Sequence, residues 1–82
     1  MPLRKQWRDL DRHTVARAPD RPGVYELADD DGTILAIDHG VLHDELKSAF
    51  AYGDAVSVRW ETTHTLDQAQ ELATTHRDRH ES

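Results

Sequence analysis

Two short segments in the first half of the chain have the pattern of paired β-strands. Gly23–Ala28 and Thr33–Ile37 are rich in strand-forming residues, and the Asp29–Gly32 segment between them has the composition of a turn. Together they predict a β-hairpin. The second strand carries apolar side chains on both faces, namely Ile34, Leu35 and Ile37. A sheet with this pattern is expected to be covered by helices on both sides.

The period changes to that of a helix after Gly40. Apolar residues recur at intervals of four, seven and eight: Leu42, Leu46, Ala49 and Phe50. This spacing predicts a helix over residues 41–52 with one face turned to the sheet. Gly53 suits the left-handed conformation that often follows the last turn of a helix.

A third strand and a second long helix follow. Val56, Val58 and Trp60 alternate with polar residues, as in a strand with one buried face. Thr65 and Gln68 have the spacing of a capping box, which predicts the start of a helix over residues 65–78. The apolar stripe of this helix consists of Leu66, Ala69, Leu72 and Ala73.

The first 22 residues read as an N-terminal arm. Residues 3–10 could form a short helix that places Leu3, Trp7 and Leu10 on one edge. Pro19 and Pro22 prevent a helix from continuing. We therefore divide the chain into an arm, residues 1–22, and a domain, residues 23–82.

These elements predict an α+β fold in which a three-stranded antiparallel sheet is flanked by helices. The strands at 23–28 and 33–38 should pair. The side chains expected to be largely buried are Val24, Leu27, Leu35, Ile37, Leu42, Leu46, Phe50, Val58, Trp60 and Leu72.

Composition narrows the protein class. The chain has 82 residues, 37% hydrophobic residues and no cysteine, so we expect one small domain without disulfides or thiolate metal sites. It has no run of 18 apolar residues and no apolar signal core, which favours a cytoplasmic protein without a membrane segment. The net charge is −6 and only two of ten basic residues are Lys, a balance that suits a protein living in high salt.

The charge is unevenly distributed. Residues 1–22 carry six basic and three acidic side chains, whereas residues 23–82 carry four and thirteen. The arm could contact nucleic acid through Arg4, Lys5, Arg8 and Arg12. The favoured interpretation is that the arm neutralises the acidic body of the domain or is simply solvated.

Six histidines invite a metal interpretation. His39 and His43, and likewise His76 and His80, are four residues apart, a spacing that can bind zinc on one helical face. Solvated or helix-capping histidines explain the same spacing, and we expect neither a metal site nor a cofactor. None of Ser48, Ser57 and Ser82 lies on a sharp strand-to-helix turn, which argues against acyl-transfer chemistry.

The order hairpin, helix, strand, helix, opened by Gly23-Val24-Tyr25, resembles the GIY-YIG nuclease superfamily. In that family a second strand about ten residues later carries Tyr-Ile/Val-Gly, a helix supplies an Arg and a later helix supplies a metal-binding Glu. The matching segments here are Ala36-Ile37-Asp38, residues 41–46 and residues 67–72. The resemblance covers residues 18–80, and the whole chain more closely resembles a small haloarchaeal family built on this fold.

The family's catalytic positions are replaced. Ala36 and Asp38 stand where the family has its second Tyr and its Gly, Glu45 stands for the Arg, and Ala73 stands for the Glu. Glu71 cannot replace that Glu, because two residues correspond to about 200° around a helix. The resemblance therefore implies a domain without nuclease chemistry and without catalytic residues.

The family fold would bring Tyr25, Asp38, Glu45 and Trp60 together in one candidate cleft. Its two carboxylates would repel phosphate and favour a cationic or neutral group. Alternatively, Asp38 could cap the helix that starts near Gly40 and Glu45 could be solvated. We expect a binding module whose partner is a protein or a second copy of the chain. The alternatives are nucleic-acid binding through the arm and residual nuclease activity.

Overall fold

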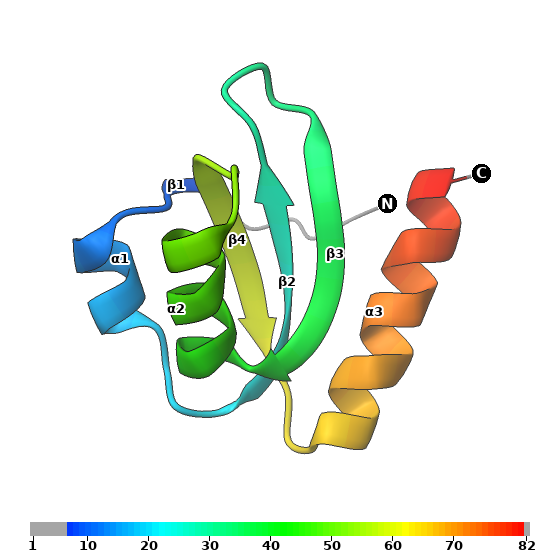
Figure 1. Cartoon of the computed structure of the whole chain (residues 1–82). Helices are drawn as coiled ribbons and strands as arrows, with labels where there is room; N and C mark the ends of the chain where they lie inside the picture. The colour runs from blue at the N-terminus through cyan, green and yellow to red at the C-terminus, as the bar shows by residue number, and fades with distance from the viewer. Residues whose placement is uncertain (1–6, 82) are drawn as a thin grey trace.

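The computed structural model describes residues 7–81, with side chains described for residues 7–78, and it has an α+β fold (Figure 1). Four strands and three helices form within these residues. In chain order they are β1 (Arg8–Asp9), α1 (Arg12–Arg17), β2 (Pro22–Ala28), β3 (Ile34–Val41), α2 (Leu42–Tyr52), β4 (Ser57–Thr62) and α3 (Leu66–Glu81). In this part of the chain no helix is long and apolar enough to cross a membrane.

The strands form one antiparallel sheet in the order β1-β4-β2-β3. The predicted hairpin of β2 and β3 is confirmed, and the predicted third strand is β4, which pairs with the other side of β2. The expected number of three strands is wrong, because Arg8 and Asp9 pair with β4 as a fourth strand. A strand of two residues is too short to show an alternating pattern in the sequence.

The helix expected over residues 3–10 is also wrong where the structure describes it. Residues 8–9 form β1, and residues 3–6 lie outside the described residues. The first helix of the described residues is α1. The carboxylate of Asp11 caps its N-terminus by accepting the backbone N–H of Thr14 at 2.8 Å. This hydrogen bond holds the pKa of Asp11 below its usual value.

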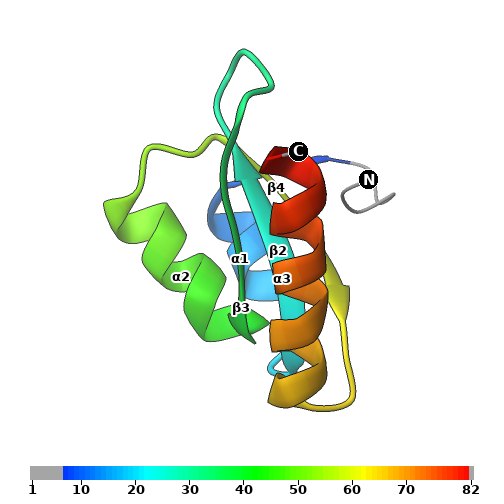
Figure 2. The ribbon, with the colours of Figure 1, turned by 90° about the vertical axis from the view of Figure 1, so that its right-hand side faces the viewer.

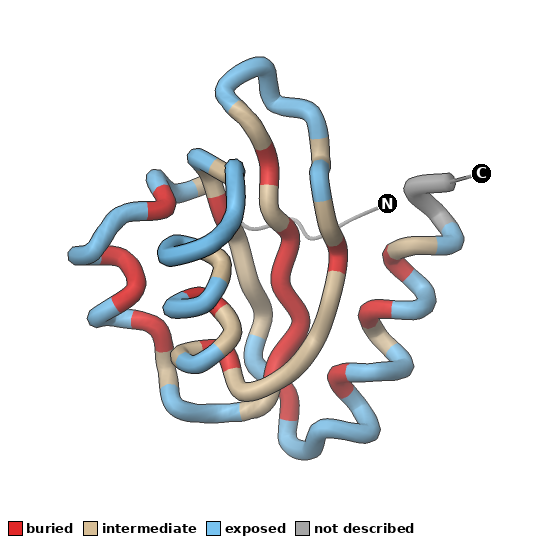
Figure 3. The backbone as a smooth tube through the Cα atoms, viewed as in Figure 1, coloured by how far each residue is buried: buried red, intermediate tan, exposed pale blue. Residues whose placement is uncertain are grey.

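Helices cover both faces of the sheet, as predicted. Figures 1 and 2 show α3 on one face and α1 with α2 on the other. Figure 3 shows the buried residues along β2 and on the helix faces turned to the sheet. The larger core cluster lies beneath α1 and α2, and its buried members are Leu10, Val15, Ala18, Tyr25, Leu42, Leu46 and Val58. The smaller one lies beneath α3 and consists of Val24, Ile37 and Ala73.

Most of the predicted core is confirmed, with two exceptions. Leu27, Trp60 and Leu72 are half-buried, but Leu35 is 48% exposed and Phe50 is 44% exposed. Leu35 lies beside the register shift of the hairpin, where the strand loses its regular alternation. Phe50 follows Leu42 by eight residues and is therefore rotated by about 80° around α2.

The two predicted helix ends differ from expectation in detail. Gly53 has a φ of −102°, so it is extended and not left-handed, although its N–H still donates to the Ala49 carbonyl. At the start of α3, Thr65 Oγ1 accepts the N–H of Gln68 at 3.1 Å, as a capping box requires. The Gln68 side chain accepts from the N–H of His64 at 2.9 Å, so the return bond reaches one residue further back.

Two glycines let α2 approach the sheet closely. Gly23 and Gly40 pair directly between β2 and β3. A Cβ at Gly23 would lie 2.7 Å from the Leu42 side chain and 2.6 Å from the carbonyl oxygen of Glu61. A Cβ at Gly40, whose φ is +152°, would lie 2.7 Å from the Glu45 side chain. The first turns of α2 therefore pack on a surface that needs glycine at both positions.

Candidate functional site

Three of the four residues of the candidate cleft lie in one row across the sheet. Tyr25 of β2 is opposite Asp38 of β3 on one side and Trp60 of β4 on the other. Directly opposed residues of antiparallel strands point to the same face, and Tyr25 belongs to the core cluster beneath α1 and α2. Glu45 projects from α2 onto this row. We call Tyr25, Asp38, Glu45 and Trp60 the Tyr25 cluster.

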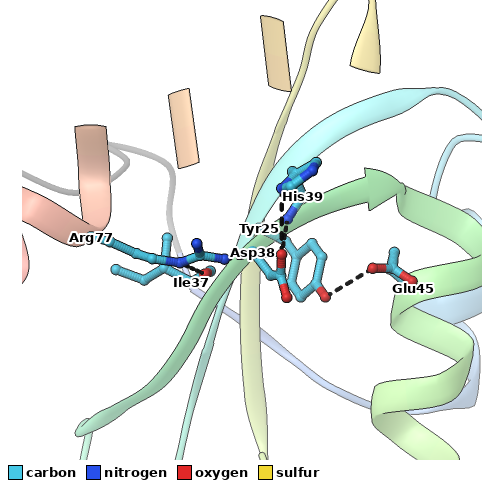
Figure 4. Close-up of polar contacts among 6 residues, drawn as sticks. All are labelled: Tyr25, Ile37, Asp38, His39, Glu45 and Arg77. Atoms are coloured by element: carbon cyan, nitrogen blue, oxygen red, sulfur yellow. Dashed lines mark hydrogen bonds and ion pairs between the residues drawn. The ribbon is translucent and has the colours of Figure 1, made fainter. Parts of the chain in front are cut away.

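Glu45 is held against Tyr25. The Tyr25 hydroxyl donates a hydrogen bond to Glu45 Oε1 at 3.3 Å (Figure 4). The Glu45 side chain lies over the open backbone of Gly40, which has no Cβ to obstruct it. Glu45 is half-buried, so the interpretation of a fully solvated surface residue is wrong.

The environment of Tyr25 favours its protonated form. Burial raises the pKa of the Tyr25 hydroxyl, and the nearby carboxylates of Glu45 and Asp38 raise it further. The hydroxyl is thus a hydrogen-bond donor at neutral pH and does not supply an anion.

Asp38 does not cap α2. The N-cap residue of α2 is Val41, and it makes no side-chain hydrogen bond. Asp38 Oδ1 accepts the backbone N–H of His39 at 2.8 Å and a guanidinium N–H of Arg77 at 3.0 Å. Arg77 reaches Asp38 from α3 (Figure 4).

Arg77 is a residue of this site that the sequence analysis missed. Its Nε donates to the carbonyl oxygen of Ile37 at 2.6 Å. The available signal was its position four residues after Ala73, which places Arg77 near the buried side of α3. Its partners lie about forty positions earlier in the chain, and no helical spacing points to them.

The arm and the Tyr25 cluster meet at Trp60. The Arg8 guanidinium lies over the Trp60 ring, 5.0 Å from its centroid. On β4 the neighbouring Arg59 lies over the ring of Trp7, at 4.2 Å. Of the four candidate nucleic-acid contacts, Arg8 and Arg12 are exposed, and Arg4 and Lys5 lie outside the described residues.

Ala73 lies on the opposite face of the sheet from Tyr25. It is fully buried against Val24 and Ile37 beneath α3, while Glu71 is exposed, as predicted. The position matched to a metal-binding Glu is therefore a core position, separated from the Tyr25 hydroxyl by the sheet.

The pair of His39 and His43 does not form the helical site considered above. His39 lies on β3 and His43 on α2, so the two do not share a helical face. His76 is buried on α3, and the side chain of His80 lies outside the described residues.

Carboxylate oxygens of Asp29, Asp30 and Asp31 lie within 4.8 Å of one another. Asp29 already accepts the N–H groups of Asp31 and Thr33, which explains this cluster as turn formation.

A cavity of about 480 Å³ lies away from the Tyr25 cluster, where β4 connects to α3. Arg21, His64 and Leu72 contribute to its lining. Sequence reasoning did not select any of these three as a site residue.

Comparison with known proteins identifies the family and no characterised relative. No curated protein and no solved structure matches the chain. A family model described as a domain of unknown function, DUF7508, matches residues 1–79. The match covers nearly the whole chain, including every element of the sheet, and the chain therefore belongs to the DUF7508 family.

Proposed function

We propose that the chain is a non-catalytic binding domain that receives a positively charged side chain of a protein partner at the Tyr25 cluster. The hydrogen bond from the Tyr25 hydroxyl to Glu45 carries this proposal. It commits the hydroxyl to the Glu45 carboxylate, and a second carboxylate, that of Asp38, lies in the next strand with its Oδ1 already paired with Arg77. An arginine or lysine head group would find acceptors there.

Phosphate is a poor ligand for the same surface. Two like charges about 4 Å apart repel by ~4 kcal/mol at an effective dielectric constant of about 20. A phosphodiester beside Glu45 would meet such repulsion, and nuclease chemistry needs stabilisation of developing negative charge. Arg77 illustrates the opposite preference, since Asp38 accepts its guanidinium.

The strand register refines the proposed GIY-YIG resemblance. Gly23 is opposite Gly40 and Tyr25 is opposite Asp38, so Gly-Val-Tyr on β2 is paired with Asp38-His39-Gly40 on β3. This register favours aligning those three residues with the family's Tyr-Ile-Gly, in place of Ala36-Ile37-Asp38. In this alignment the second glycine is retained, and a carboxylate replaces the second tyrosine.

A second candidate is nucleic-acid binding through the arm. Arg8 and Arg12 are exposed, and Arg8 lies against Trp60 of the Tyr25 cluster. Phosphate contacts by such residues would lose affinity linearly with the logarithm of salt concentration. A cationic peptide would not bind at Arg8 and Arg12, because these residues are themselves positively charged.

The test is an NMR titration of the ¹⁵N-labelled protein with acetyl-Gly-Arg-Gly-amide. The control peptide replaces arginine with citrulline, which has nearly the same shape and no charge. We expect the arginine peptide to shift the amides of Tyr25, Asp38 and Glu45, and citrulline to bind at least threefold more weakly. Glu45→Gln should weaken binding, whereas Glu71→Gln on the opposite face should not.

Two results would overturn the proposal. One is equal binding of the arginine and citrulline peptides. The other is a shift of the Arg8 and Arg12 amides on addition of an oligonucleotide whose affinity falls linearly with the logarithm of salt concentration. That result would favour the nucleic-acid candidate.

A further inference from the structure

β3 is the last strand of the sheet that the described residues form, so one of its edges faces away from the sheet. Along an antiparallel strand, the N–H and C=O of successive residues point alternately to the two neighbouring strands. Arg77 reaches the carbonyl of Ile37 from outside the sheet, so the groups of Ile37 and, two residues on, of His39 point outward. An outward N–H and C=O are the groups through which an edge strand pairs with another chain.

One side-chain pair satisfies two of these outward groups. Arg77 Nε donates to the Ile37 carbonyl at 2.6 Å, and Asp38 Oδ1 accepts the His39 N–H at 2.8 Å. The two side chains are joined by the 3.0 Å contact between Arg77 and Asp38 Oδ1 (Figure 4). The pair thus supplies one donor and one acceptor, as a neighbouring strand would.

We infer that the Asp38–Arg77 pair is an edge cap that prevents β3 from pairing with β3 of a second copy of this chain. In a symmetric antiparallel pairing centred on Asp38, Ile37 of one copy faces His39 of the other. The Ile37 carbonyl would then accept the His39 N–H of the second copy. These are the two groups that the edge cap occupies.

The rest of β3 is too irregular at its two ends to pair with another strand over a long stretch. The register shift of the hairpin lies at its first residues, and Gly40, with a φ of +152°, lies near its end. The regular stretch between them is centred on Ile37 to His39, where the edge cap sits. The symmetric pairing would also place the two Asp38 carboxylates opposite each other, which adds repulsion.

The test compares the self-association of four proteins by sedimentation equilibrium. They are the wild type, Arg77→Ala, the double variant Asp38→Ala/Arg77→Ala, and Arg17→Ala, which removes one exposed positive charge on the other face of the sheet. We expect dimerisation of the double variant to be at least tenfold tighter than that of the wild type, with Arg77→Ala between them. Hydrogen exchange at the Ile37 amide should slow on dimerisation.

Equal association of all four proteins, or of Arg17→Ala and the double variant, would overturn the inference. So would dimerisation of the double variant without protection of the Ile37 amide. A measurement on the wild type guards against loss of folding in the variants: the Arg77 Nε–H should exchange slowly with solvent. Rapid exchange of this proton would contradict the edge cap directly.

Discussion

The hydroxyl of Tyr25 and the carboxylate of Glu45 lie 3.3 Å apart, although twenty residues separate them in the chain. The contact joins the central strand β2 to α2, and it places a negative charge next to the tyrosine of the Gly23-Val24-Tyr25 segment. Burial and the neighbouring carboxylates raise the pKa of this tyrosine. The electrostatic character of the Tyr25 cluster follows from this pair.

The raised pKa of Tyr25 predicts how stability depends on pH. The folded state binds the phenolic proton more tightly than the unfolded state. The contribution of this proton to the free energy of unfolding is therefore fully present below the ordinary pKa of 10.0. It is lost as the pH rises above that value. We expect the free energy of unfolding, measured in urea between about pH 8 and 11, to fall more steeply for the wild type than for Tyr25→Phe. Parallel curves would contradict the environment described for Tyr25.

The core beneath α2 predicts different costs for two truncations of the same helix. Leu46 is fully buried, so Leu46→Ala should lower the free energy of unfolding by ~2–5 kcal/mol. Phe50 is 44% exposed, and Phe50→Ala should cost less than half as much, although it removes more atoms. Denaturant unfolding of both variants checks this order, and a larger cost at Phe50 would show that α2 packs differently.

The buried pair Glu26–Arg59 predicts strong coupling. Glu26 is fully buried, and Arg59 Nε donates to its Oε1 at 2.5 Å across β2 and β4. Arg59→Met should destabilise the fold by ~3–5 kcal/mol, because it removes this donor from a buried carboxylate. The double variant Glu26→Leu/Arg59→Met should cost less than Arg59→Met alone. Additive costs in this double-mutant cycle would show that the pair is not coupled.

Sequence periodicity was sufficient for the larger elements and not for the contacts that define the site. The change of period at Gly40 predicted α2, and the Thr65 cap predicted α3 within a few residues. β1 was missed because two residues carry no period. One of the two interpretations of Asp38 was a helix cap, because of its position before Gly40, but its carboxylate is paired with Arg77 from α3. Local sequence contains no information on such a partner, because docking of α3 on the sheet determines it.

The Tyr25 cluster likewise could be predicted only in part from the sequence. The strand patterns placed Tyr25 and Trp60 in two strands of one sheet, and the structure shows that these strands pair with the two residues opposite each other. The prediction that Leu35 is buried was wrong because the hairpin register shifts beside this residue. Ala73 was matched by spacing along α3, and its location on the other face depends on which side of the sheet that helix covers.

We propose a domain without nuclease chemistry, and a cleavage assay tests this central proposal most directly. Purified protein is incubated with single- and double-stranded DNA and with RNA in the presence of Mg²⁺ or Mn²⁺, alongside Tyr25→Phe. We predict that all substrates stay intact with both proteins, because Tyr25 is held protonated by burial and by Glu45, and Ala73 lies in the core of the other face. Cleavage by the wild type that disappears in Tyr25→Phe would contradict the account.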